Sequence, residues 1–309
     1  MDTDPVTLDA PGDVSPSPRP LPLALLVEAR PKQWAKNVLV FAAPGAAGVL
    51  DQAGSLGRSL GAFACLCLAA TGTYYLNDAA DVAADRLHPT KRRRPIAAGE
   101  IALPLARVLG VVAIVAAVAT AYAVRPQLAV VVACYVALTT SYSIWLKHVA
   151  VVDVVSVAAG FVLRAIAGAV AVDVPISDWF FIVASFGSLF MVVGKRRAEL
   201  GELGPAAAAT RATLGTYSRQ FLEQLQTIST SVVLVGYCLW AFEKAAAADA
   251  SVPWFQLSIV PFALAILRYA LLVDTGQGGA PEDIVLGDRA ILAIGLAWMA
   301  IFLAGVYAT

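Results

Sequence analysis

Long apolar runs recur along the chain and predict helices that span a membrane. A helix needs about 20 mostly apolar residues to cross the hydrocarbon core of a bilayer. We expect nine spans, roughly at 33–50, 57–80, 102–124, 126–146, 149–172, 178–196, 220–243, 253–273 and 288–308. Polar residues interrupt the entrance of the first span, and residues 21–31 are expected to form a short interfacial helix before it. The predicted fold class is therefore all-α, a polytopic membrane protein built as a nine-helix bundle.

Composition and cysteine spacing exclude several other classes of protein. The chain is 59% hydrophobic and has a formal net charge of zero, so bulk charge offers no case for binding nucleic acid. Its four cysteines lie in apolar runs without a CxxC spacing or a neighbouring histidine, which argues against a zinc site or a disulfide. Residues 1–20 are rich in Pro and Asp and predict a disordered cytosolic tail, and residues 21–309 are expected to form the transmembrane domain that carries any catalytic site.

The basic residues in the connections predict the orientation in the membrane. They cluster before the first span and after the second, fourth and sixth, whereas only Arg58, Arg125 and Lys244 fall on the other side. The positive-inside rule then places the N-terminus and the charged connections in the cytoplasm and the C-terminus outside it. A plasma-membrane protein with a site that opens to the cytoplasm is expected.

An acidic motif stands at the end of the second span. On an α-helix, Asn77, Asp78, Asp81 and Asp85 would fall within an arc of about 100°. Oxygen ligands on one face suit Mg²⁺, which usually keeps phosphates as further ligands. The plainer alternative is a solvated helix end with ordinary surface carboxylates. We favour a Mg²⁺–diphosphate site, because random surface acids seldom align beneath an apolar span.

The stretch "NDAADVAAD" (77–85) resembles the NDxxDxxxD motif of the UbiA superfamily of intramembrane prenyltransferases. The resemblance extends from about residue 21 to the end and implies a UbiA-type bundle of nine helices. It also implies that the motif holds Mg²⁺ against the diphosphate of a donor. Asn77 and Asp81 would then lie nearest the metal and Asp78 and Asp85 would support them, so that the three aspartates are the catalytic candidates.

The chain departs from that family after the sixth span. Typical members carry a second Asp-rich motif there, whereas this chain has "GKRRAELGEL" (194–203), which contains no Asp and three consecutive cations. Such a change favours a donor with more phosphate than a prenyl diphosphate has. A simple positive-inside flank is the alternative, particularly for Arg197.

Four stretches resemble a phosphoribosyltransferase branch of the superfamily. They are "RPKQWAKNVLVFAAP" (30–44), "DRLHPTKRRRPIAAGEI" (85–101), "LRAIAG" (163–168) and "SLFMVVGKRRAEL" (188–200). The resemblance implies transfer from phosphoribosyl diphosphate to a polyprenyl phosphate, such as decaprenyl phosphate, for arabinan cell-wall precursors. Membrane lipids are further partners, and the apolar outer faces permit a homo-oligomer. The candidate substrate contacts are Lys32, Lys36, Asn37, Lys91, Arg92, Arg94, Tyr142, Lys147, Arg164, Lys195, Arg196 and Glu199.

Two of these assignments have alternatives. Arg164 lies in the middle of a span and projects within about 20° of Asp153, so a structural Arg–Asp pair competes with a functional role. Tyr142 and Lys147 are five residues apart, whereas the Tyr/Lys pair common in the family has a spacing of four.

Two other functions compete with phosphoribosyl transfer. One is prenyl transfer from a prenyl diphosphate to an aromatic or lipid acceptor, which the missing second Asp motif disfavours. The other is an organic-anion carrier with sites at Arg164 and Asp153, which the acidic motif disfavours because carboxylates repel anions unless a metal intervenes.

Overall fold

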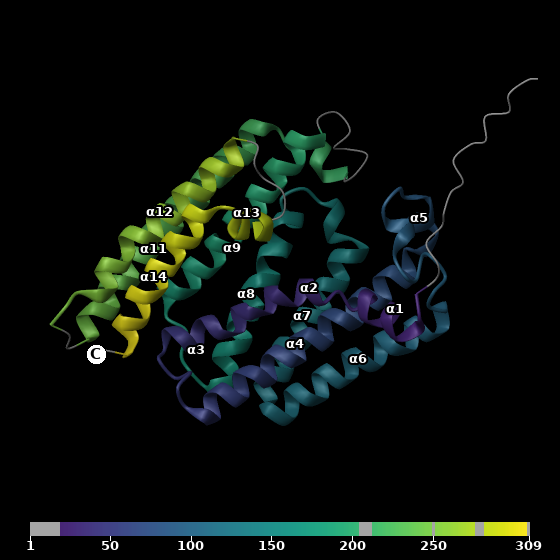
Figure 1. Cartoon of the computed structure of the whole chain (residues 1–309), viewed down its shortest axis with the longest axis horizontal. Coiled ribbons are helices and arrows are strands. Elements are labelled where there is room, and N and C mark those ends of the chain that lie inside the picture. Colours follow the sequence, from purple (N-terminus) through teal and green to yellow (C-terminus); the bar gives the residue numbers. More distant parts are fainter. Residues whose placement is uncertain (1–18, 204–211, 249–250, 276–280, 308–309) are drawn as a thin grey trace, which may run out of the picture.

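A computed structural model describes residues 19–203, 212–248, 251–275 and 281–307, and in these segments all regular elements are helices. The predicted tail lies almost entirely outside them. Eight of the helices are long and apolar enough to cross a membrane (Figure 1). They are α4 (Ala53–Ala80), α6 (Leu103–Val124), α7 (Pro126–Ile144), α8 (Val152–Val172), α9 (Asp178–Leu203), α11 (Arg219–Ala247), α12 (Trp254–Asp274) and α14 (Arg289–Tyr307).

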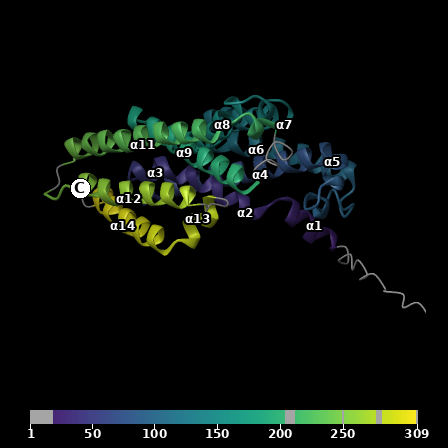
Figure 2. The same ribbon diagram turned by 90° about the horizontal axis from the view of Figure 1, so that it is seen from above.

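Helices that follow one another in the chain contact one another as antiparallel neighbours, from α4 and α6 through to α12 and α14. The connection between α6 and α7 is a single residue, Arg125. Seen from above, α9 and α11 lie on one side of the N-terminal segment and α12 and α14 on the other (Figure 2). Alternating direction brings the C-terminal ends of α4, α7, α9 and α12 to the same end of the bundle.

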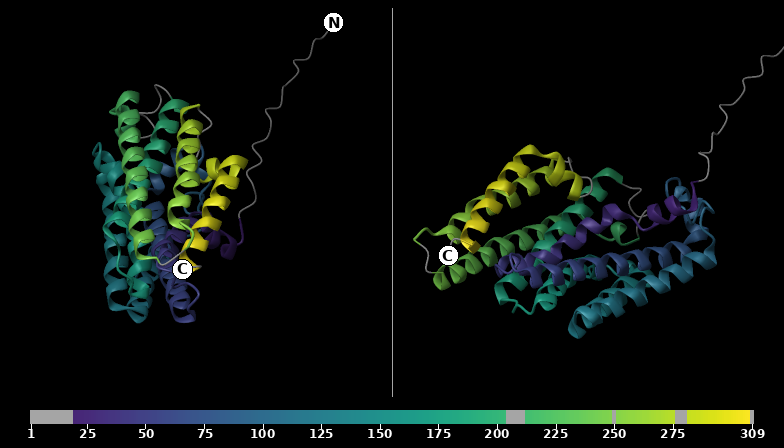
Figure 3. Two further views of the ribbon diagram at one scale, coloured as in Figure 1. Left: turned by 90° about the vertical axis from the view of Figure 1, so that its left-hand side faces the viewer. Right: turned by 60° about the horizontal axis from the view of Figure 1, so that its bottom comes forward.

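The predicted first span is not one continuous helix. It is divided into α2 (Pro31–Trp34), the 3₁₀ helix η1 (Ala35–Phe41) and α3 (Ala42–Ala46), after the short helix α1 (Leu21–Glu28). This segment crosses the middle of the molecule (Figure 3). Pro44 has no N–H to donate to the carbonyl of Val40, and that carbonyl lies against Gly168 of α8. A Cβ on Gly168 would stand 1.7 Å from the Val40 oxygen, so the backbones of η1 and α8 meet directly.

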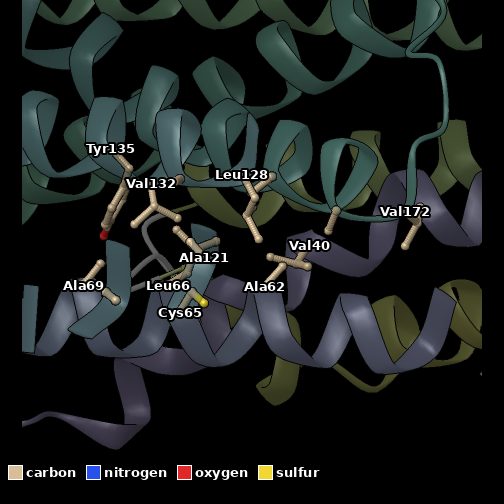
Figure 4. Packing of buried hydrophobic residues seen from close by; sticks show 14 residues of the cluster. Val40, Ala62, Cys65, Leu66, Ala69, Ala121, Leu128, Val132, Tyr135 and Val172 are labelled. Carbon is tan, nitrogen blue, oxygen red and sulfur yellow. The ribbon is translucent and has the colours of Figure 1, made fainter. Parts of the chain in front are cut away.

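Small side chains allow the remaining helices of the first half to approach closely. Ala62, Leu66 and Ala69 of α4 face Leu128 and Val132 of α7 in a buried apolar cluster (Figure 4). Gly72 of α4 lies against Gly110 of α6, where a Cβ on Gly72 would stand 2.6 Å from the Gly110 carbonyl oxygen. Close packing of small residues is the usual way in which helices associate within a bilayer.

The helix α9 continues past the predicted end of its span to Leu203, so that "GKRRAELGEL" is helical. The acidic motif occupies the end of α4 and the short helix α5 (Val82–Leu87). The ends of α4 and α9 and the start of α8 therefore carry the polar chemistry at one end of the bundle.

Candidate active site

The acidic motif does not lie on one straight helix as predicted. Helix α4 ends at Ala80, and Asp81 is the junction to α5, with φ −88° and ψ 7°. Backbone hydrogen bonds still run from Asp81 N to Asn77 O and from Asp85 N to Asp81 O, each 2.9 Å long. The interruption leaves Asp81 exposed, whereas Asp78 and Asp85 are buried.

The two buried carboxylates of the motif are neutralised by arginines. Arg30 and Arg94 donate to opposite oxygens of Asp78, the latter at 3.1 Å. Arg94 also donates to Asp85 over 2.7 Å, and the Nζ atom of Lys91 lies 3.8 Å from the other oxygen of Asp85. Asp78 and Asp85 thus position cations in the site.

The other two members of the motif keep oxygen atoms for a ligand. The amide nitrogen of Asn77 donates to Ser143 Oγ over 2.7 Å, which leaves its carbonyl oxygen as an acceptor. The Asp81 carboxylate has no partner among the described residues. Mg²⁺ is commonly held by one or two carboxylates together with waters and substrate phosphates. The described residues contain no group of three or more acidic, His or Cys side chains that could hold a metal, so Asn77 and Asp81 fit Mg²⁺ only when a substrate supplies further ligands.

Glu28 and Arg30 belong to this site, although our sequence interpretation assigned them no role. Glu28, at the end of α1, is 1% exposed and accepts from Ile96 N over 3.3 Å. Burial first, and then its contact with Asp78, raises the pKa of Glu28 to about 8. Arg30 adopts a left-handed backbone with φ 53° and stacks over the Tyr74 ring at 4.7 Å. A lone glutamate ending the apolar run "LPLALLVE" was the available signal.

The remaining predicted cations near the motif differ in exposure. Lys32 and Arg92 are exposed, and their side chains form no ion pair within the described part of the chain. Lys36 is half-buried. Lys91 and Arg94 are thus the members of the predicted set that the structure brings to the acidic motif.

A second buried polar cluster lies where α8 begins. Asp153 is fully buried and accepts from Tyr217 Oη and, over 3.1 Å, from Thr213 Oγ1. The Arg196 Nε atom lies 3.6 Å from Asp153, and its Nη1 donates to Glu199 over 2.8 Å. Burial and the bond to Asp153 raise the pKa of the Tyr217 hydroxyl. Arg196 and Glu199 are therefore already paired with each other, and Arg196 also pairs with Asp153.

Lys195 and Arg197 face different surroundings on α9. Arg197 donates to Gln226 over 2.6 Å and to Asp274 over 2.7 Å, so it ties α9 to α11 and α12. Lys195 is half-buried and has no ion pair among the described residues. Lys147 lies in η3 (Leu146–His148), which contacts η5 (Ala212–Gly215) beside the second cluster, and Tyr142 is half-buried in α7.

Arg164 does not pair with Asp153. Eleven residues of helix separate them by about 16 Å along the axis. Arg164 instead donates to Asn37 Oδ1 at 2.8 Å, to Gly160 O at 2.7 Å and to Tyr135 Oη at 2.9 Å. Its guanidinium carbon lies 4.8 Å from the centre of the Tyr135 ring, and no carboxylate in the described segments forms an ion pair with it. Asn37 is fully buried and also donates to Cys67 Sγ.

Comparisons with known proteins agree on one family. The UbiA prenyltransferase family matches residues 38–286. The chain is 45% identical over 291 residues to the decaprenyl-phosphate phosphoribosyltransferase of Mycobacterium tuberculosis, covering 93% of this chain and 95% of that protein. It is 43% identical to the enzyme of the same name from Mycolicibacterium smegmatis, covering 94% of each chain.

Among solved structures, the UbiA homolog of Archaeoglobus fulgidus bound to DMAPP and Mg²⁺ has a TM-score of 0.68 against this chain. The match covers 93% of this chain and all of the other, at 16% identity. At that identity the likeness supports the fold alone, which agrees with the predicted UbiA-type bundle.

Proposed function

Because the chain belongs to the UbiA prenyltransferase family, we propose that it transfers the 5-phosphoribosyl group of phosphoribosyl diphosphate to a polyprenyl phosphate. Decaprenyl phosphate is the expected acceptor, and arabinan cell-wall precursors are the expected use. The observation that carries the choice of donor is Lys195, a cation without an ion pair among the described residues, in the stretch where typical members carry a second Asp-rich motif. The names of the two mycobacterial relatives support it.

Mg²⁺ is the proposed cofactor, and Asn77 and Asp81 would hold it together with the donor's diphosphate. When bound, it neutralises charge on the leaving diphosphate. Asp78 and Asp85 would then act through Arg30, Arg94 and Lys91, the cations with which they pair. These three side chains would supply further hydrogen bonds to the phosphate oxygens of the sugar donor.

In the reaction, the bond between ribose C1 and the diphosphate oxygen breaks and its electron pair leaves with diphosphate. An oxygen of the lipid phosphate forms the new bond to C1 from the opposite face, with inversion expected. No general base is required, because the acceptor phosphate is already ionised near neutral pH. Positioning and charge neutralisation therefore carry the catalysis.

The proposed orientation follows the basic residues. The site and the N-terminus would face the cytoplasm and the C-terminus would lie outside, in the plasma membrane. The lipid acceptor would enter from the bilayer, so its phosphate and the water-soluble donor would meet at the membrane surface.

Transfer can be measured with the full chain in detergent, using radiolabelled phosphoribosyl diphosphate, decaprenyl phosphate and Mg²⁺. Label should enter the lipid phase, EDTA should abolish this transfer, and Asp81→Ala should lower it at least about 100-fold. Asp51→Ala is the matched control, because Asp51 is also exposed and lies at the opposite end of the bundle. A parallel reaction with dimethylallyl diphosphate and an aromatic acid tests prenyl transfer. If only that reaction proceeds, the chain is a prenyltransferase and the proposed donor is wrong.

A further inference from the structure

A pocket of about 280 Å³ lies beside the acidic motif, between the end of α1 and the turn that precedes residue 96. Its polar wall includes Arg30, Thr90, Arg93 and Arg94, together with Glu28. The sequence pattern does not place residues 28 and 93 together, because 65 positions separate them along the chain. The pocket does not include the proposed metal ligands Asn77 and Asp81, but Arg30 and Arg94 in its wall donate to Asp78 of the same motif.

The arginines of this pocket are held in place and remain accessible. Asp78 accepts from Arg30 on one oxygen and from Arg94 on the other, which fixes both guanidinium groups. Their side chains are still 27% and 29% exposed. The side chain of Arg93 is exposed and has no ion pair among the described residues. Three guanidinium groups therefore converge on one cavity, and one of them is uncommitted.

The charge balance of the pocket favours an anion. Arg30, Arg93, Arg94 and nearby Lys91 carry four positive charges, whereas Asp78, Asp85 and Glu28 carry at most three negative ones. The surplus is positive whether Glu28 is ionised or not. Guanidinium groups present paired N–H donors that match the oxygens of a phosphate.

We propose that this pocket binds the 5-phosphate of the sugar donor, with Arg93 as a direct ligand. This inference rests on the proposed function. The 5-phosphate and the 1-diphosphate of the donor stand on opposite sides of the ribose, so they require two neighbouring anion sites. Arg94 connects the two sites, because it lines this pocket and also donates to Asp78 and Asp85 of the acidic motif. A prenyl diphosphate carries no phosphate apart from its diphosphate, so the pocket would select the sugar donor against it.

The test compares Arg93→Ala with Arg107→Ala, a cation that is also exposed but lies on α6 away from the pocket. Ribose 5-phosphate and inorganic diphosphate serve as inhibitors of transfer by the full chain. In Arg93→Ala, inhibition by ribose 5-phosphate should weaken about tenfold or more, because a charge-assisted contact is lost. Inhibition by diphosphate and the KM for decaprenyl phosphate should not change. Arg107→Ala should match the wild type, and Arg93→Lys should recover part of the loss.

Two outcomes of the inhibition assay would overturn the inference. If Arg93→Ala raises the KM for decaprenyl phosphate and leaves ribose 5-phosphate inhibition intact, the pocket binds the lipid phosphate. If neither changes, it binds no phosphate of either substrate. If the wild type transfers no phosphoribosyl group, the proposed function fails separately. Calorimetry then measures the binding of ribose 5-phosphate to the wild type and to Arg93→Ala. Equal binding by the two proteins, or no binding by either, rejects the proposed phosphate pocket.

Discussion

The Tyr217 hydroxyl joins the start of α8 to the segment that precedes α11, and its removal is a sharp test of the second polar cluster. Tyr217 Oη donates to Asp153, and it accepts from the backbone N–H of Val151 over 2.6 Å. Val151 has φ 68° and ψ −47°, an unfavourable backbone for a β-branched residue. Tyr217→Phe deletes both hydrogen bonds and keeps the ring stacked on Phe221.

The magnitude follows from what each lost bond does. A hydrogen bond to a buried carboxylate contributes roughly 1.5–3 kcal/mol, and a neutral one about 1 kcal/mol. Thr213 and Arg196 remain beside Asp153, so the carboxylate is not left alone. We therefore expect a loss of about 2–4 kcal/mol in the free energy of unfolding. Because the pKa of Tyr217 is raised, the hydroxyl stays protonated and the loss should be the same on both sides of neutral pH.

The assay is thermal unfolding of the purified chain in detergent. Tyr122→Phe is the matched control, since Tyr122 is 64% exposed on α6. A double-mutant cycle with Asp153→Asn isolates the pair, and the two changes should be strongly non-additive. Additive effects, or a Tyr217→Phe protein as stable as the Tyr122→Phe control, would refute the reasoning. Lys147 lies beside this segment, so a lower kcat for transfer is also expected.

Three further changes should separate the roles of single residues. Asp81→Ala should lower transfer at least about 100-fold without shifting the unfolding temperature, because Asp81 is exposed and has no partner among the described residues. If the rate of transfer and the unfolding temperature both fall, Asp81 has a structural role. The pKa of Glu28 is raised from 4.5 to about 8, so the folded protein holds this proton more tightly than the unfolded chain does. The stability that this proton contributes is full below about pH 4.5 and is lost as the pH rises to about 8. Glu28→Gln should flatten that pH dependence in thermal unfolding, and an unchanged slope would contradict the assignment. Arg164→Lys should destabilise the protein about as much as Arg164→Met, because lysine cannot reach Asn37, Gly160 and Tyr135 together; a stable lysine variant would mean that charge alone suffices.

The spanning helices could be predicted because length and apolar content decide whether a segment crosses a bilayer. The division of residues 31–46 could not, since it depends on a contact between Val40 and Gly168, far apart in the chain. The acidic motif could be recognised from local spacing. Arg94 was among the predicted contacts, but Arg30 could not be recognised as a partner, because it lies 48 positions before Asp78.

Angular projection also misled the interpretation of Arg164. Two residues can share a helical face and still be too far apart along the axis to touch, as Asp153 and Arg164 are. Apart from Gly160 on its own helix, the partners of Arg164 come from η1 and α7, and no local pattern connects these residues. Tertiary contacts of this kind decide which polar residues form a site and which hold helices together.

An acidic motif that receives an anionic donor would repel it if all its carboxylates were free. In the folded chain these carboxylates differ in burial and in pairing. Asp78 and Asp85 are buried against Arg30, Arg94 and Lys91, so their charges hold cations at the site and do not face the substrate. Only Asp81 remains exposed and unpaired within the described part of the motif, next to the amide of Asn77. A single metal ion between Asp81 and a diphosphate would then be enough to make the whole site attractive to anions.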